Sequence, residues 1–296
     1  MMAISKDDPT KLTMVGSPVD VPGEFPNTVA ASAKNNLACV ATTGAVAGIS
    51  CAPFTADSGL GAMDTLRPID LGQSTPPVGP TNTVSHSFFS EDESMLFTMV
   101  KGDPAVNKTG FVSMLKIGSQ MGNGCAAAAP EDVRSSPEGT AVLFGSQVIP
   151  GTGGRSVFAT DASFGGAVLS IDAAAGEATV AGKAAIDGQA ATCWAAFSPA
   201  TSSVFVTDVG VPRVVEMSAR DASIINELDL ADTGAAGFID IGAAGSFIYA
   251  LGPGDAGAGA IAVLNVSGGP GSAKLAQRFS LDGLAGASAQ GIAILS

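Results

Sequence analysis

Histidine is the scarcest reactive side chain in this sequence, with a single example at position 86 among 296 residues. One histidine and four scattered cysteines do not provide the several His or Cys ligands of a zinc site, so no metal site is predicted. A Ser-His-Asp triad would have to use His86, and the sequence has no GxSxG motif. Its glycine-rich stretches lack the strand-to-helix context and lysine of a phosphate cradle, so no cofactor is predicted.

Basic residues are also few, with 14 Lys and Arg against 27 Asp and Glu and a formal net charge of -13. This charge repels polyanions, which argues against nucleic acid and anionic membrane as partners. No apolar run approaches the ~20 residues of a membrane helix, so no membrane span is predicted. The opening segment, MMAISKDDPTKL, lacks the apolar core of a signal peptide.

What the sequence does contain is apolar residues and turn formers. Hydrophobic residues make up 46% of the chain, which argues against disorder, and the 38 glycines and 17 prolines are spread along it. Apolar residues at helical spacing are scarce. This pattern is typical of many short strands joined by turns, so the sequence predicts an all-β fold, and 296 residues fit one propeller domain.

A short phrase recurs along the chain, in which a small residue closes one apolar strand and a second apolar strand follows. The closing residues are Ser32, Ser90, Ser136, Ser198 and Gly242. Seven positions after each comes an apolar residue of the second strand, namely Cys39, Phe97, Leu143, Phe205 and Tyr249. The spacing between phrases is close to the ~40 to 50 residues of blade-type repeats once loops are allowed for. The phrase is therefore interpreted as the first hairpin of a repeated structural unit.

The segment from 192 to 232 shows the unit in full, as four strands reading CWAAF, SVFVTD, RVVEMS and IINELDL. Four antiparallel strands on a short repeat predict a β-propeller blade, whose two apolar faces must be covered by neighbouring blades. We predict a single propeller domain with about six blades represented. Its parts are a partial blade at 1–24, blades at 25–79, 80–128, 129–187, 188–234 and 235–285, and a closing inner strand at 286–296.

The cysteines predict one disulfide and leave a second open. Folding the hairpin around residue 45 sets Cys39 opposite Cys51, within bridging distance. Cys125 and Cys193 remain as a second possible pair, and four buried thiols are the alternative. Two glycosylation motifs, at Asn107 and Asn265, point with the disulfide to an oxidising compartment.

Three stretches resemble a known family: GSPVDVPGEFPNTVAASAKNNLACVATTGA, LRPIDLGQSTPPVGPTNTVSHSFFSEDESMLFTMVKGDP and TGFVSMLKI. They are similar to secreted fungal proteins usually labelled 3-carboxymuconate cyclase-like, which belong with the lactonase-type seven-bladed propellers. The resemblance covers essentially the whole chain. It implies secretion to the extracellular space or cell wall. Family members normally carry a signal peptide and further strands ahead of the position matching Met1, so the chain resembles a member lacking its N-terminus.

Candidate site residues lie two and four positions before the closing residues of the repeated phrase, on strands predicted to be innermost in their blades. They are His86, Asp132, Arg134, Trp194 and Asp240, of which Asp132, Trp194 and Asp240 are assigned to ligand binding. The family resemblance implies a histidine, arginines and a glutamate as catalytic groups. His86 and Arg134 match two of these roles, and Glu131 is the nearest glutamate. The structural alternative is that Asp132 and Arg134 form ion pairs with neighbouring blades and that His86 only provides a hydrogen bond to a loop.

Two functions remain open at this point. The first is a secreted or cell-wall fungal propeller that acts as a monomeric binding or surface protein, because its predicted catalytic set is incomplete. The second is a cyclase-type isomerase or lactonase that acts on a small anionic lactone or muconate.

Overall fold

The computed structural model describes residues 1–118, 126–253 and 258–295. The chain divides into two compact units, which we describe separately. Unit 1 comprises residues 1–101 and 112–135, and unit 2 comprises residues 102–111 and 136–296. In the described residues all regular structure is β-strand except two single-turn 3-10 helices, η1 (Pro104–Val106) and η2 (Ala231–Thr233). No helix in these ranges has the length and apolarity needed to cross a membrane.

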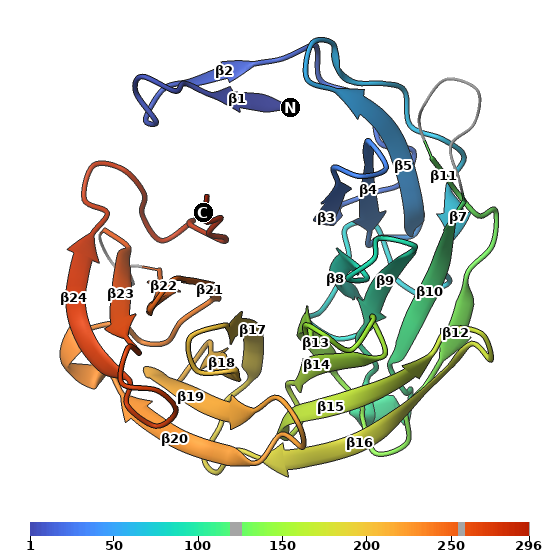
Figure 1. Cartoon of the computed structure of the whole chain (residues 1–296). Coiled ribbons are helices and arrows are strands. Elements are labelled where there is room, and N and C mark those ends of the chain that lie inside the picture. The colour runs from blue at the N-terminus through green and yellow to red at the C-terminus, as the bar shows by residue number, and fades with distance from the viewer. Residues whose placement is uncertain (119–125, 254–257, 296) are drawn as a thin grey trace. The chain divides into compact units, whose positions relative to one another are not determined.

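Unit 1 begins with a short hairpin and continues with two antiparallel sheets (Figure 1). The hairpin pairs β1 (Met2–Ile4) with β2 (Leu12–Met14). Sheet 1 contains β3 (Pro26–Ser32), β4 (Leu37–Thr42), β5 (Gly48–Thr55), β6 (Gly59–Leu60) and β7 (Arg67–Pro68). Sheet 2 contains β8 (Val84–Phe89), β9 (Met95–Val100), β10 (Phe111–Gly118), β11 (Ala127–Ala128) and β12 (Val133–Ser135).

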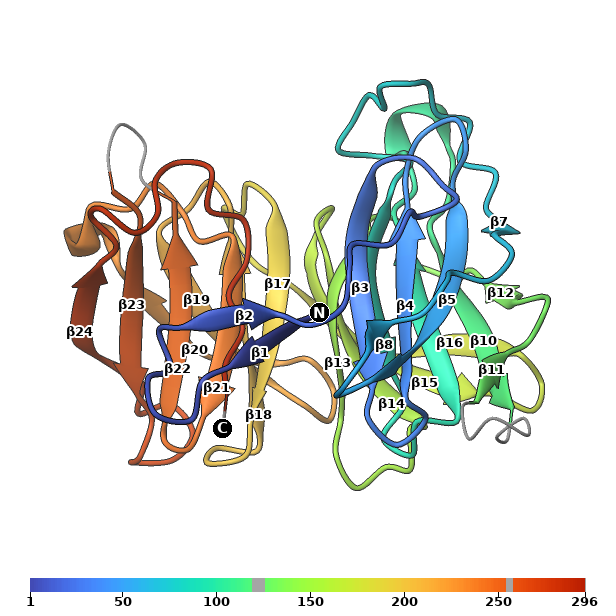
Figure 2. The same ribbon diagram turned by 90° about the horizontal axis from the view of Figure 1, so that it is seen from above.

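Unit 2 contains three four-stranded antiparallel sheets, each with its strands in chain order (Figure 2). Sheet 3 consists of β13 (Leu143–Val148), β14 (Ser156–Asp161), β15 (Gly165–Asp172) and β16 (Glu177–Ala185). Sheet 4 consists of β17 (Thr192–Ser198), β18 (Ser203–Asp208), β19 (Arg213–Ser218) and β20 (Ile224–Asp229). Sheet 5 consists of β21 (Asp240–Ala244), β22 (Phe247–Gly252), β23 (Ala260–Asn265) and β24 (Lys274–Ser280).

Sheet 4 shows why these sequences form stacked sheets. Every residue of β18 is buried, and successive side chains of a strand point to opposite faces. Val204 and Val206 enter an apolar cluster shared with sheet 3, which includes Phe158. Phe205, between them, enters the cluster shared with sheet 5, which includes Ile248. Both faces of the sheet are thus covered by neighbours, as the sequence predicted for a propeller blade.

The all-β propeller prediction is confirmed, and the four strands predicted between 192 and 232 are β17 to β20. First strands of neighbouring sheets lie against each other within each unit, as β3 does with β8 and β17 with β21. In unit 1 this contact includes a hydrogen bond of 2.9 Å from the Ser87 amide to Thr28 Oγ1.

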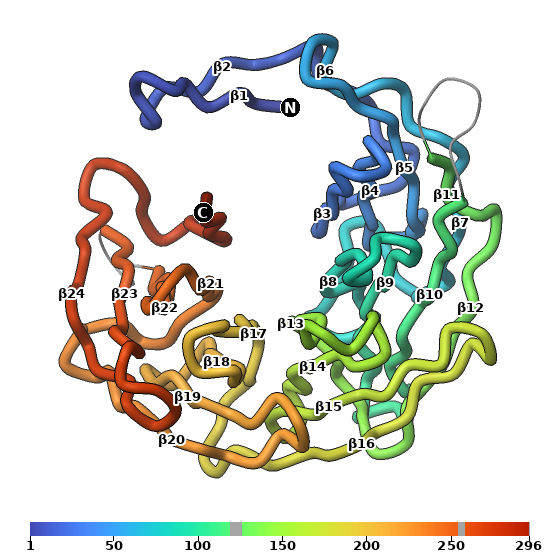
Figure 3. Tube along the Cα trace, in the orientation of Figure 1, coloured from blue at the N-terminus to red at the C-terminus, as the bar shows by residue number. Residues whose placement is uncertain are grey.

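Two predicted strand assignments are wrong. β11 and β12 follow one another along the same edge of β10, so residues 133–135 close sheet 2 rather than opening sheet 3 (Figure 3). The phrase around Ser136 therefore spans two sheets, and Leu143 belongs to a first strand, β13. The predicted strand at 286–296 is also not formed within residues 286–295, although the Ile294 side chain lies over Gly242 of β21.

Candidate functional site

Asp132 and Arg134 form an ion pair at the outer edge of sheet 2. Arg134 Nε lies 2.9 Å from Asp132 Oδ2, and its Nη2 donates both to Asp132 Oδ1 at 3.2 Å and to the Pro68 carbonyl at 2.8 Å. Ser113 Oγ of β10 donates to the same carboxylate at 2.5 Å. The pair therefore ties three segments of unit 1, β7, β10 and β12, to one another. The sequence left open ion pairs from Asp132 and Arg134 to neighbouring blades, whereas the two side chains pair with each other within sheet 2 and only the Pro68 contact reaches sheet 1.

His86 and Arg134 do not share a site. His86 lies on β8, and β9 and β10 separate β8 from β12. Three strand spacings of about 4.8 Å put the two backbones about 14 Å apart. The prediction that Arg134 lies on an innermost strand is wrong because the phrase that located it spans two sheets. Glu131 is exposed in the bend before β12, three residues ahead of Arg134.

His86 occupies a half-buried position near the start of β8. Its ring centroid lies 5.3 Å from that of Phe88, two residues along the same face. The strand register shifts between Val84 and His86, which marks a bulge that changes the direction of the side chains. Asn27 Nδ2 donates to the Val84 carbonyl at 2.5 Å, and the Val84 amide donates to Thr43 Oγ1 at 3.1 Å. Sheet 1 thus fixes the strand end that carries His86.

In unit 2, Trp194 lies near the start of β17, beside the first strand of sheet 3. Its ring meets Phe144 of β13 edge-on, with centroids 5.3 Å apart and planes at 82°. The backbones of β13 and β17 approach closely here. A Cβ added to Gly145 would lie only 2.5 Å from the Cys193 carbonyl oxygen. Trp194 is half-buried and also packs against the cluster between sheets 4 and 5. The first strands therefore hold its indole in a fixed position.

Asp240 begins β21, the first strand next to β17. Its Oδ1 accepts from the Ile241 amide at 2.8 Å and its Oδ2 from the Ile292 amide at 2.7 Å. Burial raises the pKa of this carboxyl above its usual value, and the two hydrogen bonds only partly oppose that effect. The Asp240 charge also acts on the thiol of Cys193, the residue before Trp194. Trp194 and Asp240 thus lie on the neighbouring first strands β17 and β21, and their shared role in ligand binding stays a prediction.

The cysteines give one disulfide. Cys39 and Cys51 face each other across β4 and β5 and are bonded, with Cα atoms 4.0 Å apart, which confirms the hairpin prediction. Cys193 is a free buried thiol, so the second predicted pair is not formed in this structure; Cys125 lies outside the described residues. Burial raises the pKa of the Cys193 thiol to about 12. A thiol in this state is a poor nucleophile.

The two predicted glycosylation positions remain predictions. Asn107 is exposed and follows η1 with a left-handed backbone, φ 55°. Asn265 is half-buried at the end of β23, where its Oδ1 accepts from the Ser267 amide at 2.8 Å.

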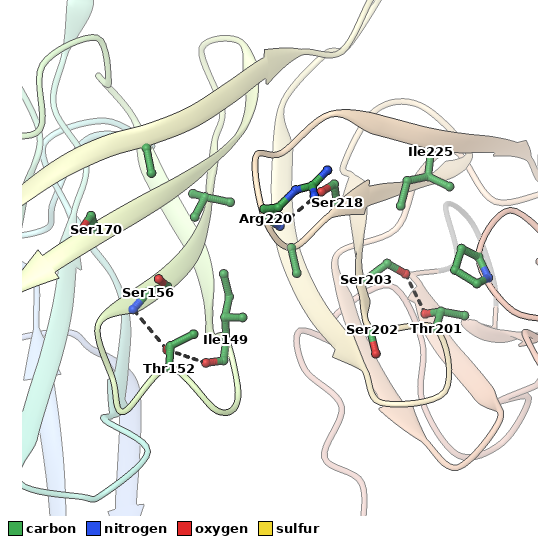
Figure 4. Close-up of a pocket in the computed structure, with 14 residues that line it drawn as sticks. Ile149, Thr152, Ser156, Ser170, Thr201, Ser202, Ser203, Ser218, Arg220 and Ile225 are labelled. Atoms are coloured by element: carbon green, nitrogen blue, oxygen red, sulfur yellow. Dashed lines mark hydrogen bonds between the residues drawn. The ribbon is translucent and has the colours of Figure 1, made fainter.

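A separate cleft of about 580 Å³ lies in unit 2 between sheets 3 and 4, near the turns at the ends of their strands (Figure 4). Seven of its fourteen lining residues are serine or threonine, and one is arginine. The polar lining is Thr152, Ser156, Ser170, Thr201, Ser202, Ser203, Ser218 and Arg220. None of the predicted site residues lines it. The sequence offered one signal, the hydroxyl-rich turn SPATSS, which was interpreted only as the turn of a hairpin.

The described ranges contain no group of three or more His, Cys, Asp or Glu side chains arranged to hold a metal ion. Of the predicted site residues, His86 lies in unit 1 and Asp240 and Trp194 lie in unit 2.

Searches of family models and of curated protein sequences found no match to this chain. Solved structures of similar fold were found. The Pseudomonas aeruginosa periplasmic gluconolactonase PpgL has a TM-score of 0.62 and 16% identity, covering 86% of this chain and 72% of its own. A provisionally assigned 6-phosphogluconolactonase from Bacteroides uniformis has a TM-score of 0.63 and 15% identity, covering 86% and 71%.

A nidogen/laminin complex contains another chain of similar fold, with a TM-score of 0.56 and 10% identity over 94% of this chain and 88% of that one. At these identities the likeness is one of fold. The same architecture thus occurs both in lactonases and in an assembly of binding proteins.

Proposed function

We propose that this chain is a lactonase that hydrolyses a small cyclic ester. The observation that carries the proposal is the similarity of its fold to gluconolactonase-type propellers, at TM-scores of 0.62 and 0.63. The candidate residues support it, because each unit offers a side chain suited to proton transfer. This is the second of the two functions that the sequence left open.

Lactone hydrolysis needs proton transfer at two points. Water adds to the acyl carbon and loses a proton to a base, and the ring C–O bond breaks as its oxygen gains a proton. The best catalytic groups have pKa values near the working pH. Histidine has such a pKa as a residue type, and burial moves the Asp240 carboxyl in that direction. We assign Asp240 as the candidate acid–base residue of unit 2, with Trp194 as a wall for the substrate ring, and His86 as the separate candidate acid–base residue of unit 1.

The substrate we propose is a neutral lactone and not one that carries several carboxylates. A carboxymuconate would need a cationic clamp, and Arg134, which matches the arginine role implied by the family resemblance, is occupied by Asp132 and the Pro68 carbonyl. A neutral sugar lactone requires no such clamp. The 3-carboxymuconate reaction implied by the family resemblance is the narrower alternative within the same proposal.

Secretion forms part of the proposal. The Cys39–Cys51 disulfide supports an oxidising compartment, because such bonds persist mainly outside the cytosol. An extracellular or cell-wall location and a fungal source remain implications of the family resemblance. Mass spectrometry of the protein purified from its native host would show whether Asn107 and Asn265 carry glycans.

One observation favours the other function, a propeller that binds a surface partner. Asp132 and Arg134 satisfy each other, so the predicted catalytic set is not assembled in unit 1. This hypothesis expects no turnover of any lactone, together with saturable binding to a cell-wall fraction.

Variant kinetics test the proposal and its residue assignments. The purified chain is mixed with D-glucono-δ-lactone in a pH-stat, and spontaneous hydrolysis is subtracted. Substitution of the catalytic candidate, Asp240→Asn in unit 2 or His86→Ala in unit 1, is expected to lower kcat/KM by about 10² or more, the usual contribution of a general acid or base. Asp282→Asn, an exposed carboxyl of unit 2, is the matched control and should leave the rate unchanged. Full activity in both His86→Ala and Asp240→Asn would refute the assignment.

A further inference from the structure

We propose that the cleft between sheets 3 and 4 of unit 2 binds a polyhydroxylated carboxylate, such as a sugar acid, at a site distinct from Trp194 and Asp240. The proposal does not depend on lactonase activity. It is carried by the volume of the cleft, by the direction of the hydrogen bonds made by its hydroxyl groups, and by its single charged side chain.

The cleft is separated from Trp194 along β17. Trp194 lies near the start of this strand, and Thr201 lies in the turn that follows its last residue, Ser198. Four residues of extended strand between Trp194 and Ser198 span about 13 Å. A volume of about 580 Å³ is within the usual range for small-molecule sites.

Hydroxyl groups on the sheet 4 side of the cleft form a chain of hydrogen bonds that runs from Thr201 through Ser203 to the carboxylate of Glu216. Ser203 Oγ donates to the buried carboxylate of Glu216 at 2.6 Å, which uses its only proton. It must therefore accept from Thr201 Oγ1, which lies 2.6 Å away. Glu216 is held in turn by the Gly271 amide, at 2.9 Å from its second oxygen. Neither lone pair of the Thr201 hydroxyl oxygen is used in this chain of bonds, so the oxygen can accept from a ligand.

Two further hydroxyl oxygens, those of Thr152 and Ser218, also face the cleft as hydrogen-bond acceptors. Thr152 Oγ1, on the sheet 3 wall, donates to the Ile149 carbonyl at 2.7 Å (Figure 4). Ser218 Oγ accepts from the Arg220 amide at 3.2 Å and lies beside the exposed carboxylate of Asp221, whose pKa it helps to lower. The Thr152 proton points into the protein, and each of the two oxygens can accept one more hydrogen bond. A ligand that matches three such acceptors must carry several O–H or N–H donors.

Arg220 decides which donor-rich ligand fits. It is the one charged side chain among the fourteen lining residues, and 90% of its side-chain surface is exposed. Its nearest acid, Asp221, is 3.9 Å away, which leaves most guanidinium donors facing solvent. With no carboxylate in the lining, a cationic ligand such as an amine has no counter-charge. Hydroxyl donors and one carboxylate acceptor on the same ligand satisfy both features of the cleft.

The apolar lining sets the expected strength. Ile149, Val168, Ile225 and Pro270 offer surface for C–H groups, but no aromatic ring lines the cleft. Binding therefore depends on hydrogen bonds that replace those made to water, each of which contributes little net free energy. We expect a dissociation constant of ~1 mM for a monosaccharide acid.

NMR titration of the isotope-labelled full chain tests this site. The probes are D-glucuronate, D-glucose, which lacks the carboxylate, and acetate, which lacks the hydroxyls. The expected result is saturable shifts of the amides of Ser202, Ser218 and Arg220, with D-glucuronate binding more tightly than either partial probe. Absence of saturable shifts at these amides would overturn the proposal.

Two variants assign the contacts. Arg220→Gln should weaken D-glucuronate about ten-fold and leave D-glucose unchanged, since it removes a charge-assisted contact. Thr201→Val removes one acceptor at constant shape and should weaken both sugars a few-fold. Lys274→Gln, an exposed cation on β24, is the matched control. Equal affinity in Arg220→Gln, Thr201→Val and the control would refute the site. Retention of binding in His86→Ala and Asp240→Asn would separate it from the lactonase proposal.

Discussion

The carboxylate of Asp240 accepts a hydrogen bond of 2.7 Å from the amide of Ile292, 52 residues later in the chain. This contact holds the segment around Ile292 against the start of β21, and the Ile294 side chain covers Gly242 on the same strand. The same carboxyl is one of the two candidate acid–base groups. Its protonation is therefore expected to affect stability independently of the proposed catalytic role.

Asp240 makes the stability of the protein depend on pH in a defined direction. Its folded-state pKa is raised by burial, so between the unfolded value of 3.8 and the raised value the folded chain binds the extra proton. Stability from this group is thus greatest at low pH and falls as pH rises through the raised pKa. We expect Asp240→Asn to remove this decline in urea unfolding measured from pH 3.5 to 7. Parallel pH curves for the variant and the wild type would contradict the assignment.

Removal of the Cys39–Cys51 disulfide should destabilise the protein. The bond closes a short loop, with a sequence separation of 12, which corresponds to about 3 kcal/mol in the chain-entropy model. The double variant Cys39→Ala/Cys51→Ala is expected to lower the free energy of unfolding by roughly that amount, measured by urea denaturation. Treatment of the wild type with reductant should lower its unfolding midpoint, while the double variant should not respond.

Gly145→Ala should push apart the first strands of sheets 3 and 4. The added Cβ would lie 2.5 Å from the Cys193 carbonyl oxygen and 2.6 Å from Trp194 Cα, both backbone atoms that cannot rotate away. Overpacking of this kind costs about 1 to 3 kcal/mol. Trp194 fluorescence during thermal unfolding reports both the loss and any change in the native environment of the indole. Gly118→Ala, whose Cβ would have ordinary contact distances, is the control.

Cys193 should be unreactive in the native protein. It is buried, and its thiol pKa of about 12 leaves almost no thiolate at pH 8. We expect iodoacetamide to label Cys193 only after addition of denaturant, without any reductant, as measured by peptide mass spectrometry. Recovery of Cys193 in a disulfide-linked peptide would contradict the structure and restore the second predicted pair.

The fold was predictable because its cause is local. Alternation in SVFVTD sends Val204 and Val206 to one face and Phe205 to the other, so the sequence alone indicates a sheet covered on both sides. The register of the hairpin likewise placed Cys39 opposite Cys51. Both inferences use only residues that are neighbours along one strand or across one turn.

The site was less predictable because its contacts cross between sheets. The phrase around Ser136 has the same strand–turn–strand pattern as the others, and only pairing shows that β12 joins β10 rather than β13. Because β12 pairs with β10, Arg134 lies at the edge of sheet 2 and not on an innermost strand. The cleft was missed for a similar reason, since Thr152 and Ser218 lie 66 positions apart and meet only when sheets 3 and 4 pack.

The measurement that tests the central proposal most directly is acid release by the wild-type chain from D-glucono-δ-lactone, followed at constant pH over a range of substrate concentrations. A lactonase gives a rate above spontaneous hydrolysis that is proportional to protein and saturates with substrate. A rate equal to that of buffer at every concentration, with 6-phosphogluconolactone and carboxymuconolactone also unreacted, would contradict the account and favour the binding protein.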